Sequence, residues 1–514
     1  MKRFCRVIFS RYFFSAIMIF LELSVLLLWL LGLWQNSIYA LAAGYLINFI
    51  SVLNLITKDT NPEYKIPWLI ILITMPLFGT VLYVLFYSRP MSKREGELMG
   101  ELFYEINGLT DEPKRDDVLL SLKNESPGAA GNALSILNDD AFAKIYQNSS
   151  CEYLKIGEVY YEKLLCELQK AKKFIFLEYF IISEGNMLLG ILDILKDKAQ
   201  SGVEVRIMYD DLGCMKTLSR HFEKQLSEYK ISSLRFNRIS PSLSTAHNNR
   251  NHRKICIIDG ECAFTGGINI ADEYINQKMR FGHFKDGGVL IRGLAVEGLL
   301  RQFLCDWSLV KREKESIATY LSSIKEAQNC DTGYYIPFGS GPKPTYKREV
   351  GKRAIINLIA RAEQYVFITT PYLIIDHELT EALRGAALRG LDVRIITPAV
   401  PDKKIIKLMT KSSYPYLLDA GVKICEYTPG FIHEKLIISD DRFAIIGTIN
   451  LDYRSLVHHY ENAVWIYNSP EINYMKEEFL KTASVSKKIE ENEARLNKAE
   501  RIIRSLVRVF APLL

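Results

Sequence analysis

The sequence predicts an α/β protein with two repeated halves, preceded by an apolar helical region. A motif of His252, Lys254, Asp259, Gly266 and Asn269 recurs once, with each residue 181 positions further along the chain. Both copies lie in segments where helix-like stretches alternate with buried strands, which is typical of a duplicated α/β domain. The first 90 residues contain three apolar stretches, each near the roughly 20 residues that a helix needs to cross a bilayer.

Residues 1–90 are predicted to be a transmembrane region of two to three helices. The apolar stretches cover residues 12–34, 38–56 and 66–87, and Pro76 and Gly79 predict a kink in the last one. Basic residues precede the first stretch and follow the last. Basic residues favour the cytoplasmic side, but three membrane spans would place these two clusters on opposite sides. Whether the first stretch spans the membrane is therefore left open. We expect a multi-pass protein of the cell membrane, with its lobes on the cytoplasmic face.

Residues 91–150 are polar, without sustained periodicity, and are predicted to be a linker leading into the first lobe. Residues 151–325 and 326–484 are predicted to form the two lobes. Each lobe shows a helix, a strand, a second helix and a second strand in that order. Residues 485–514 are predicted to form a C-terminal amphipathic helix, lying on the membrane or packed on the second lobe.

The motif contains the side chains that a phosphate site needs. In a strand, His252 and Lys254 point to one face, and so do their counterparts His433 and Lys435. Each copy therefore offers an imidazole and a fixed cation. The glycines allow a close approach of the backbone to an anion, and neutral donors for phosphoryl oxygens come from Asn269, Asn450 and Thr448.

Composition narrows the chemistry further. The net charge of +6 fits an anionic substrate or a membrane surface, although a solvated basic face would give the same value. The nine cysteines show no metal-ligand spacing, so no metal and no cofactor are expected. Five histidines outside the motif are interpreted as structural, and they are His221, His283, His377, His458 and His459.

The paired motif H-x-K-x4-D-x6-G-[GST]-x-N resembles that of the phospholipase D superfamily. The flanking runs GGINIADEY at residues 266–274 and GTINLDYRS at 447–455, together with the terminal FAPLL, resemble bacterial cardiolipin synthases. This resemblance implies two lobes related by a pseudo-twofold, each a mixed sheet flanked by helices, with both histidines facing one phosphate.

The resemblance also implies roles for individual residues. One of His252 and His433 attacks phosphorus while the other protonates the leaving alcohol, and Lys254 and Lys435 stabilise the phosphoryl charge. An acidic residue further along orients each histidine. By position, we expect Glu461 to orient His433 and Asp286 to orient His252. Asp259 and its counterpart Asp440 complete the motif, with structural and catalytic roles both open.

The first residue to carry the phosphatidyl group is predicted to be His252. Arg250 and Arg253 are its neighbours and favour a neutral imidazole, whereas an acidic partner, Glu461, favours an imidazolium at His433. The strand ends at Glu178 and at residues 370–372 are expected to shape the acceptor pocket.

The implied activity is transfer of a phosphatidyl group from one phosphatidylglycerol to another through a phosphatidyl-histidine, giving cardiolipin and glycerol. The expected partners are therefore phosphatidylglycerol and membrane lipid. Alternatives are a phosphatidylserine synthase or a phospholipase D hydrolase that uses water. A nuclease is disfavoured because no basic stripe interleaved with aromatic residues surrounds the motifs, so no nucleic acid partner is expected. A non-catalytic lipid-binding scaffold is disfavoured because both motifs are intact.

Overall fold

The computed structural model describes residues 38–58, 60–87, 97–98, 100–102, 112–140, 142–238, 249–313, 315–343, 345–346, 348–494 and 509. The chain divides into two compact units. The first comprises residues 1–90, 239–248 and 498–514, and the second comprises residues 91–238 and 249–497. The apolar stretch at residues 12–34 lies outside the described residues.

The first unit contains three described helices, α3 (Ile38–Thr57), α4 (Pro62–Thr74) and α5 (Pro76–Phe86). The break between α4 and α5 falls at Pro76, where the sequence predicts a kink. Proline has no N–H, so the carbonyl of Leu72 loses its helical partner. The buried Asn48 replaces it, since its Nδ2 lies 3.1 Å from Leu72 O and 2.9 Å from Thr80 Oγ1. This amide therefore holds the helices together at the break.

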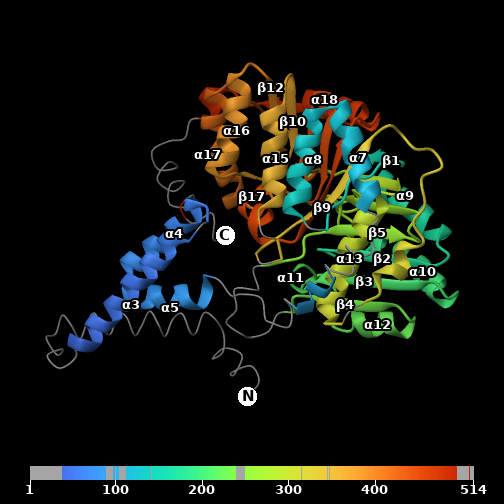
Figure 1. Ribbon diagram of the computed structural model, residues 1–514, viewed down its shortest axis with the longest axis horizontal. Coiled ribbons are helices and arrows are strands. Elements are labelled where there is room, and N and C mark those ends of the chain that lie inside the picture. The colour runs from blue at the N-terminus through green and yellow to red at the C-terminus, as the bar shows by residue number, and fades with distance from the viewer. Residues whose placement is uncertain are drawn as a thin grey trace. The chain divides into compact units, whose positions relative to one another are not determined.

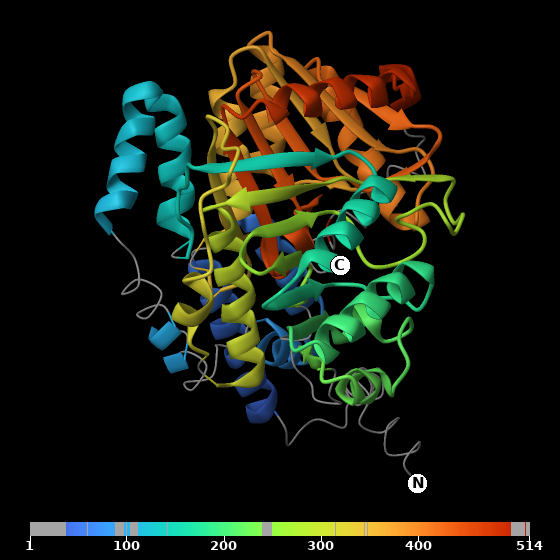
Figure 2. The ribbon, with the colours of Figure 1, turned by 90° about the vertical axis from the view of Figure 1, so that its right-hand side faces the viewer.

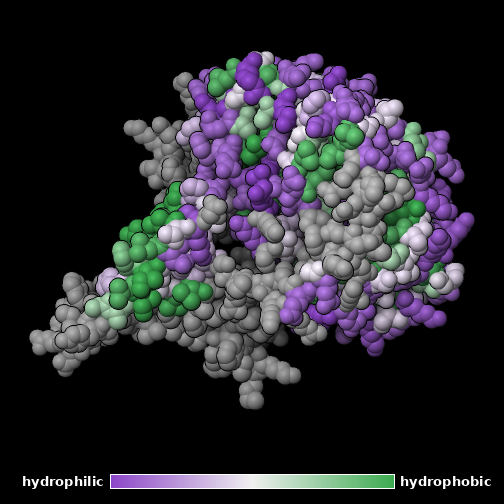
Figure 3. All heavy atoms as spheres, viewed as in Figure 1, coloured by the Kyte–Doolittle hydropathy of each residue, from purple (hydrophilic) through white to green (hydrophobic). Residues whose placement is uncertain are grey.

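Apolar side chains cover much of the surface of these helices (Figure 3). No helix among the described residues has both the length and the apolar character that crossing a bilayer requires. The stretch expected as one span over residues 66–87 is divided between α4 and α5. Exposed large hydrophobic residues on the three helices are Tyr45, Leu46, Ile47, Phe49, Ile50, Leu53, Ile56, Ile66, Ile70, Ile73 and Val84.

The prediction that residues 91–150 form a linker is wrong over much of its length. Residues Glu112–Glu125 form α7 and Pro127–Asp139 form α8, which Ser126 caps through its side chain. The buried face of α8 packs into the core of the second lobe. The sequence signal was weak because small residues, not a run of large apolar ones, make this helix's contact face.

The first lobe is built on a mixed sheet in the order β1-β8-β6-β5-β2-β3-β4. Strands β2, β3 and β4 are parallel, whereas β5, β6, β8 and β1 follow in antiparallel pairs. The strands are β1 (Ser149–Leu154), β2 (Phe174–Tyr179), β3 (Glu204–Asp210), β4 (Ser232–Phe236), β5 (Lys254–Ile258), β6 (Cys262–Gly266) and β8 (Gly288–Gly293).

The second lobe repeats this sheet in the order β13-β12-β10-β15-β16-β18-β9, with β19 added at the β13 edge. The predicted duplicated α/β architecture with mixed sheets is therefore confirmed. Its strands are β9 (Tyr334–Ser340), β10 (Tyr365–Thr369), β12 (Asp392–Pro398), β13 (Lys423–Tyr427), β15 (Leu436–Ser439), β16 (Phe443–Gly447), β18 (Glu461–Tyr467) and β19 (Ser486–Lys488).

The sheets of the two lobes lie side by side (Figures 1 and 2) and share one apolar core with α13 (Val296–Lys311) and α18 (Glu471–Ser484). The other face of the first sheet packs against α9 (Gly157–Lys170) and α10 (Asn186–Gln200). The other face of the second packs against α8 and three further helices. These are α15 (Val350–Arg361), α16 (His377–Leu388) and α17 (Lys404–Asp419).

Short elements complete the fold. The helical turns are α11 (Asp211–Cys214), α12 (Phe222–Glu228), α14 (Ile317–Leu321), α19 (Glu491–Ala494) and a π-helical turn at Arg454–His458. Two small parallel pairs join β11 (Leu373–Ile374) to β17 (Leu451–Asp452), and β14 (Gly430–Ile432) to β7 (His283–Lys285).

The helix predicted over residues 485–514 is wrong at its start. Residues Ser486–Lys488 form β19, which pairs with β13 and extends the second sheet. Pairing with an open strand edge satisfies the backbone there and outweighs the local helix preference. Most of the remaining segment lies outside the described residues.

Candidate active site

Each motif histidine is held by the opposite lobe. The backbone N–H of His252 donates to the carbonyl of Tyr460 at 2.8 Å, and that of His433 donates to the carbonyl of Lys285 at 2.7 Å. The next residue in each case supplies a carboxylate. His252 Nδ1 lies 2.8 Å from Glu461 Oε2, and His433 Nδ1 lies 2.6 Å from Asp286 Oδ2.

The two acidic residues were found from the sequence, but their predicted pairing is wrong. Glu461 contacts His252 instead of His433, and Asp286 contacts His433 instead of His252. The cause is pairing of backbone across the lobes. The β7 strand lies parallel to β14, which precedes His433, and a bridge joins Asn251 to Tyr460. The reciprocal exchange is what two lobes related by a twofold would produce.

Burial keeps both imidazoles neutral. It lowers the pKa of His252 to about 3, against the opposing effect of Glu461. It also lowers the pKa of His433 well below its ordinary value, and the charges of Lys435 and Lys254 act in the same direction. A carboxylate can only accept a hydrogen bond, so each Nδ1 carries the proton and each Nε2 keeps a lone pair. Both rings are thus prepared to attack or to receive a proton.

The carboxylate partners are buried as well. Burial raises the pKa of Asp286 to about 6, partly offset by Lys435. Burial also acts to raise the pKa of Glu461, but the neighbouring His252 outweighs it and the pKa lies below its ordinary value. Both groups are therefore ionised at neutral pH and can orient a neutral ring.

The two motif lysines come together in the same interior. Lys254 Nζ donates to the carbonyl of His252 at 2.6 Å, and Lys435 Nζ makes the equivalent bond to the carbonyl of His433. Burial lowers the pKa of Lys254 to about 7, with a further lowering by the charge of Lys435. Burial lowers the pKa of Lys435 to about 8. An anion between these lysines would favour their charged forms, since an opposite charge raises the pKa of an ammonium.

The contacts of the two motif aspartates fit a structural role. Asp259 accepts backbone N–H groups of Lys172, Lys173 and Phe174 at 2.7 to 2.8 Å. Asp440 accepts three equivalent groups in the second lobe. Each aspartate follows the far end of the motif strand, about 20 Å along the chain from its histidine at 3.3 Å per residue.

The neutral donors of the motif differ between the lobes. Asn269 donates to Tyr274 Oη at 2.6 Å and accepts from Ile181 N, whereas Asn450 Oδ1 has no hydrogen-bond partner among the described residues. Thr448 donates its hydroxyl proton to Glu461 and so orients that carboxylate. Its counterpart is Gly267, where a Cβ would lie 2.1 Å from Asp286 Oδ1. Glycine is required there because the carboxylate fills the space.

Glu178 supports the site from within the fold, whereas Tyr372 makes a separate contact. Glu178 is fully buried and accepts from Asn251 Nδ2 at 2.5 Å, so it fixes the residue before His252. Tyr372 donates to Asp402 Oδ2 at 2.7 Å. The pocket-shaping role expected for Glu178 is replaced by a positioning role, because its side chain points into the lobe interior.

The two arginines that the sequence places beside His252 do not face its ring. Arg253 Nη1 lies 2.6 Å from Asp306 Oδ2, and its Nη2 donates to Tyr346 Oη at 2.7 Å. Arg250 donates to Asn237 O at 3.0 Å. Arg253 alternates with His252 along the extended segment and so points to its other side, whereas Arg250 makes its contacts with Asn237 and Asp210. These charges therefore do not keep His252 neutral as predicted, and burial does so instead.

A third histidine belongs to the site and was missed. His459 is buried, its ring centroid lies 5.6 Å from that of His252, and its Nδ1 lies 3.7 Å from Glu461 Oε1. Its position two residues before Glu461 was the available signal.

Among the described residues, His252, His459 and Glu461 form one group that could hold a metal ion, with ligand atoms within 4.8 Å of one another. The adjacent ammonium of Lys254 opposes a cation there.

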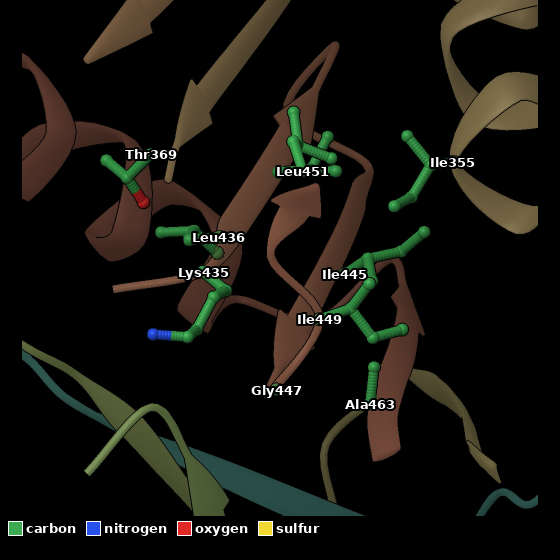
Figure 4. A pocket seen from close by; sticks show the side chains of 10 residues that line it. Ile355, Thr369, Lys435, Leu436, Ile445, Gly447, Ile449, Leu451 and Ala463 are labelled. Atoms are coloured by element: carbon green, nitrogen blue, oxygen red, sulfur yellow. The ribbon is translucent and has the colours of Figure 1, made fainter. Parts of the chain in front are cut away.

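An apolar cavity lies behind the second motif strand. In Figure 4 the Lys435 ammonium points away from Ile355, Ile445 and Ile449, which line the cavity's other side. This wall excludes water from one side of the lysine. It thereby contributes to the burial that lowers the lysine's pKa.

Residues 164–280 and 355–483 match the family described as cardiolipin synthase, PLD-like domain, and residues 46–86 match the phospholipase D-nuclease N-terminal family. An uncharacterized protein of Streptococcus mutans is 40% identical over 90% of this chain and 99% of its own length. Cardiolipin synthase 2 of Bacillus cereus is 33% identical over 89% of this chain and 88% of its own length.

Among solved structures, the phosphatidylserine synthase of Haemophilus influenzae aligns with a TM-score of 0.54 at 15% identity. The alignment covers 71% of this chain and 94% of that one. This likeness concerns the fold alone. The match to the family and the extent of the identity to Bacillus cereus cardiolipin synthase 2 lead to one conclusion: the chain belongs to the cardiolipin synthase family of the phospholipase D superfamily.

Proposed function

We propose that this protein is a membrane-associated phosphatidyltransferase that makes cardiolipin and glycerol from two phosphatidylglycerol molecules. The observation that carries the proposal is the reciprocal pair of contacts, His252 with Glu461 and His433 with Asp286. Two oriented imidazoles beside two lysines suit a two-step exchange at phosphorus, where one group attacks and the other transfers a proton.

In the first step, Nε2 of one histidine attacks phosphorus and the bond to the glycerol oxygen breaks. The negative charge of the bound phosphodiester raises the pKa of the other histidine, which takes up a proton from water. It gives that proton to the glycerol oxygen, so free glycerol leaves and a phosphatidyl-histidine remains. In the second step, the same histidine takes the proton of the acceptor's hydroxyl as that oxygen attacks phosphorus. Lys254 and Lys435 stabilise the extra negative charge in both transition states.

Action at the cell membrane fits the helices of the first unit. Their exposed apolar residues, including Ile47, Ile50 and Ile73, would be costly in water and stable in lipid. The match of residues 46–86 to the N-terminal family supports the same placement. We propose a multi-pass protein with its lobes on the cytoplasmic face.

The product profile tests the function. Purified full-length protein is added to vesicles of phosphatidylglycerol labelled in both the acyl chains and the head group. We expect one cardiolipin and one free glycerol from each pair of substrate molecules. A double variant, His252→Gln with His433→Gln, controls for background. Formation of phosphatidic acid without cardiolipin would identify a hydrolase instead, and incorporation of added serine would identify a phosphatidylserine synthase.

A further inference from the structure

The two half-sites differ at one position next to the histidines. Gly266 pairs with Gly288 in the first sheet, and Gly447 pairs with Ala463 in the second. Equivalent residues of the two lobes therefore differ by 181 in residue number on the motif strands. On the following strands, β8 and β18, they differ by 463 − 288 = 175. Asp286 then corresponds to Glu461, and Phe284 corresponds to His459.

The corresponding side chains occupy corresponding places. The Phe284 ring centroid lies 5.7 Å from that of His433, and the His459 ring centroid lies 5.6 Å from that of His252. The duplicated fold thus places a phenyl ring beside one histidine and an imidazole beside the other. Two further rings, Tyr274 at 5.5 Å and Phe431 at 6.0 Å, surround His433.

The imidazole ring of His459 is buried and makes no hydrogen bond to the described residues. The exposed fraction of His459 is 8%, and neither Nδ1 nor Nε2 lies within hydrogen-bond distance of a partner in the part of the chain that the structure describes. The same holds for Glu461 Oε1, 3.7 Å from His459 Nδ1. A buried polar atom without a partner costs about 1–3 kcal/mol, so retaining three together indicates a bound polar group.

The backbone before His459 is also unusual. Its N–H donates to the carbonyl of Arg454 at 2.8 Å, five residues back, and closes a π-helical turn over Arg454–His458. Such single π-helical turns are rare and are frequently found at functional sites. The corresponding segment before Phe284 has no such turn among the described residues.

We propose that His459 and the free oxygen of Glu461 bind the hydroxyl groups of the glycerol head group, on the His252 side of phosphorus. This rests on the proposed phosphatidyltransferase function. A hydroxyl is both donor and acceptor, so it can satisfy an imidazole nitrogen and a carboxylate oxygen together. Phe284 offers no such partner beside His433.

The assignment also fixes the roles of the two catalytic histidines. The leaving and entering alcohols occupy the side of phosphorus opposite the attacking group, and the residue on their side handles the proton. His252, beside the alcohol, is then the acid and base, and His433 is the nucleophile. The negative charge of the bound phosphodiester raises the pKa of His252, which takes up a proton from water. In the first step the His433–phosphorus bond forms, the phosphorus–glycerol bond breaks, and His252 gives this proton to the glycerol oxygen. In the second, His252 takes a proton from the acceptor hydroxyl, which displaces His433.

Substitution of His459 by the residue of the other half-site tests the alcohol subsite. The variants are His459→Phe, His459→Gln, which keeps a donor and an acceptor, and the matched control Phe284→Leu. With labelled phosphatidylglycerol, we expect His459→Phe to lower the ratio of cardiolipin to phosphatidic acid about tenfold, because water replaces the poorly held alcohol. Its KM for the acceptor should rise by a similar factor. His459→Gln should restore most of the ratio, and Phe284→Leu should leave it unchanged.

A structural role for His459 would give a different pattern. Cardiolipin and phosphatidic acid would then fall together, their ratio would stay at the wild-type value, and the melting temperature of His459→Phe would drop. That result would overturn the proposal. Absence of cardiolipin from the wild-type protein would instead reject the proposed function itself, so the two failures are distinguishable.

A substrate with an easy leaving group tests the histidine roles. Phosphatidyl-p-nitrophenol releases its phenol without a proton donor, so only the nucleophile is needed for the first step. We expect His252→Gln to release about one p-nitrophenol per protein molecule and His433→Gln to release none. A burst from His433→Gln and none from His252→Gln would assign the adduct to His252 and overturn the proposal.

Discussion

His252 takes its orienting carboxylate from the opposite lobe, with Nδ1 2.8 Å from Glu461 Oε2. The adjacent backbone bond from His252 N to Tyr460 O fixes this contact before any substrate is bound. His433 and Asp286 repeat the arrangement in the reverse direction. Neither lobe alone therefore contains a complete half-site, and each step of the reaction requires the lobes to be packed together.

The contacts between lobes predict which histidine's tautomer each carboxylate determines. Glu461→Gln should disturb the Nδ1 tautomer of His252 and leave His433 unchanged, and Asp286→Asn should do the opposite. Each change should reduce turnover about 10²–10⁴-fold, the usual contribution of an oriented general acid or base. Nitrogen NMR of labelled histidines measures the tautomers. A response of His433 to Glu461→Gln would contradict the pairing.

The motif histidines should be individually essential. His252→Ala and His433→Ala should each abolish transfer between natural lipids while the protein remains folded, because neither role can be taken over by the other ring. Lys254→Ala and Lys435→Ala should each cost about 2.7–4 kcal/mol of transition-state stabilisation, by analogy with the loss of one oxyanion donor. The measurement is kcat/KM together with a melting curve. Substantial transfer by either histidine variant would show that the two motifs do not act as a pair.

The motif aspartates should affect stability and not chemistry. Asp259→Ala leaves three backbone N–H groups without an acceptor, at a cost of about 1–3 kcal/mol or more in the free energy of unfolding. Asp259→Asn keeps an acceptor and tolerates the left-handed backbone at φ 55°, so it should cost less. Denaturant unfolding gives the stability, and activity is normalised to folded protein. A large loss of turnover in stable Asp259→Asn would indicate a catalytic role.

The lowered pKa values of the two motif lysines predict that activity is lost at a lower alkaline pH than ordinary lysines would allow. Their folded pKa values of about 7 and about 8 lie below the ordinary lysine value. An ammonium with a lowered pKa loses its proton as the pH rises through that value. The kcat/KM of the free protein should therefore fall from about pH 7–8 upward, and not near pH 10. If Lys254→Arg retains activity, its guanidinium stays charged and the limit should move upward. An unchanged alkaline limit in an active Lys254→Arg variant would show that another group sets it.

The same shifts predict the direction of stability with pH. Between about pH 7 and the ordinary lysine pKa of about 10.4, the unfolded chain binds more protons at Lys254 than the folded protein does. The contribution of this lysine to stability therefore rises with pH across that window. Lys254→Met should flatten the rise, as measured by melting temperatures at a series of pH values.

Transfer should continue in a chelator. The groups that could hold a metal, His252, His459 and Glu461, lie beside the charge of Lys254, and lysines already supply positive charge at phosphorus. Activity in excess chelator should match that of untreated protein. Complete loss, restored by one particular divalent ion, would identify a metal-dependent reaction and a metal site at these three residues.

The sequence by itself determined the duplicated α/β fold, the motif pair and the identity of both orienting carboxylates. These features depend on the sequence repeat and on patterns between residues that are close together in the sequence. An offset of 181 and strands such as Phe174–Tyr179 can be read along one chain. The family could be identified from the same residues. The spacing within each motif is determined by one strand and the turn after it, so it can be read from the sequence.

Tertiary structure alone decided which residues meet. Glu461 pairs with His252 because strands of different lobes pack edge to edge, and no spacing along the chain encodes that contact. Packing also placed α8 on the second lobe and β19 on its sheet edge. It also brought the His459 ring beside that of His252, a contact that its position two residues before Glu461 does not specify. Contacts across the lobe interface depend on the burial of two complementary apolar faces, and that burial is a property of the folded pair, not of either repeat.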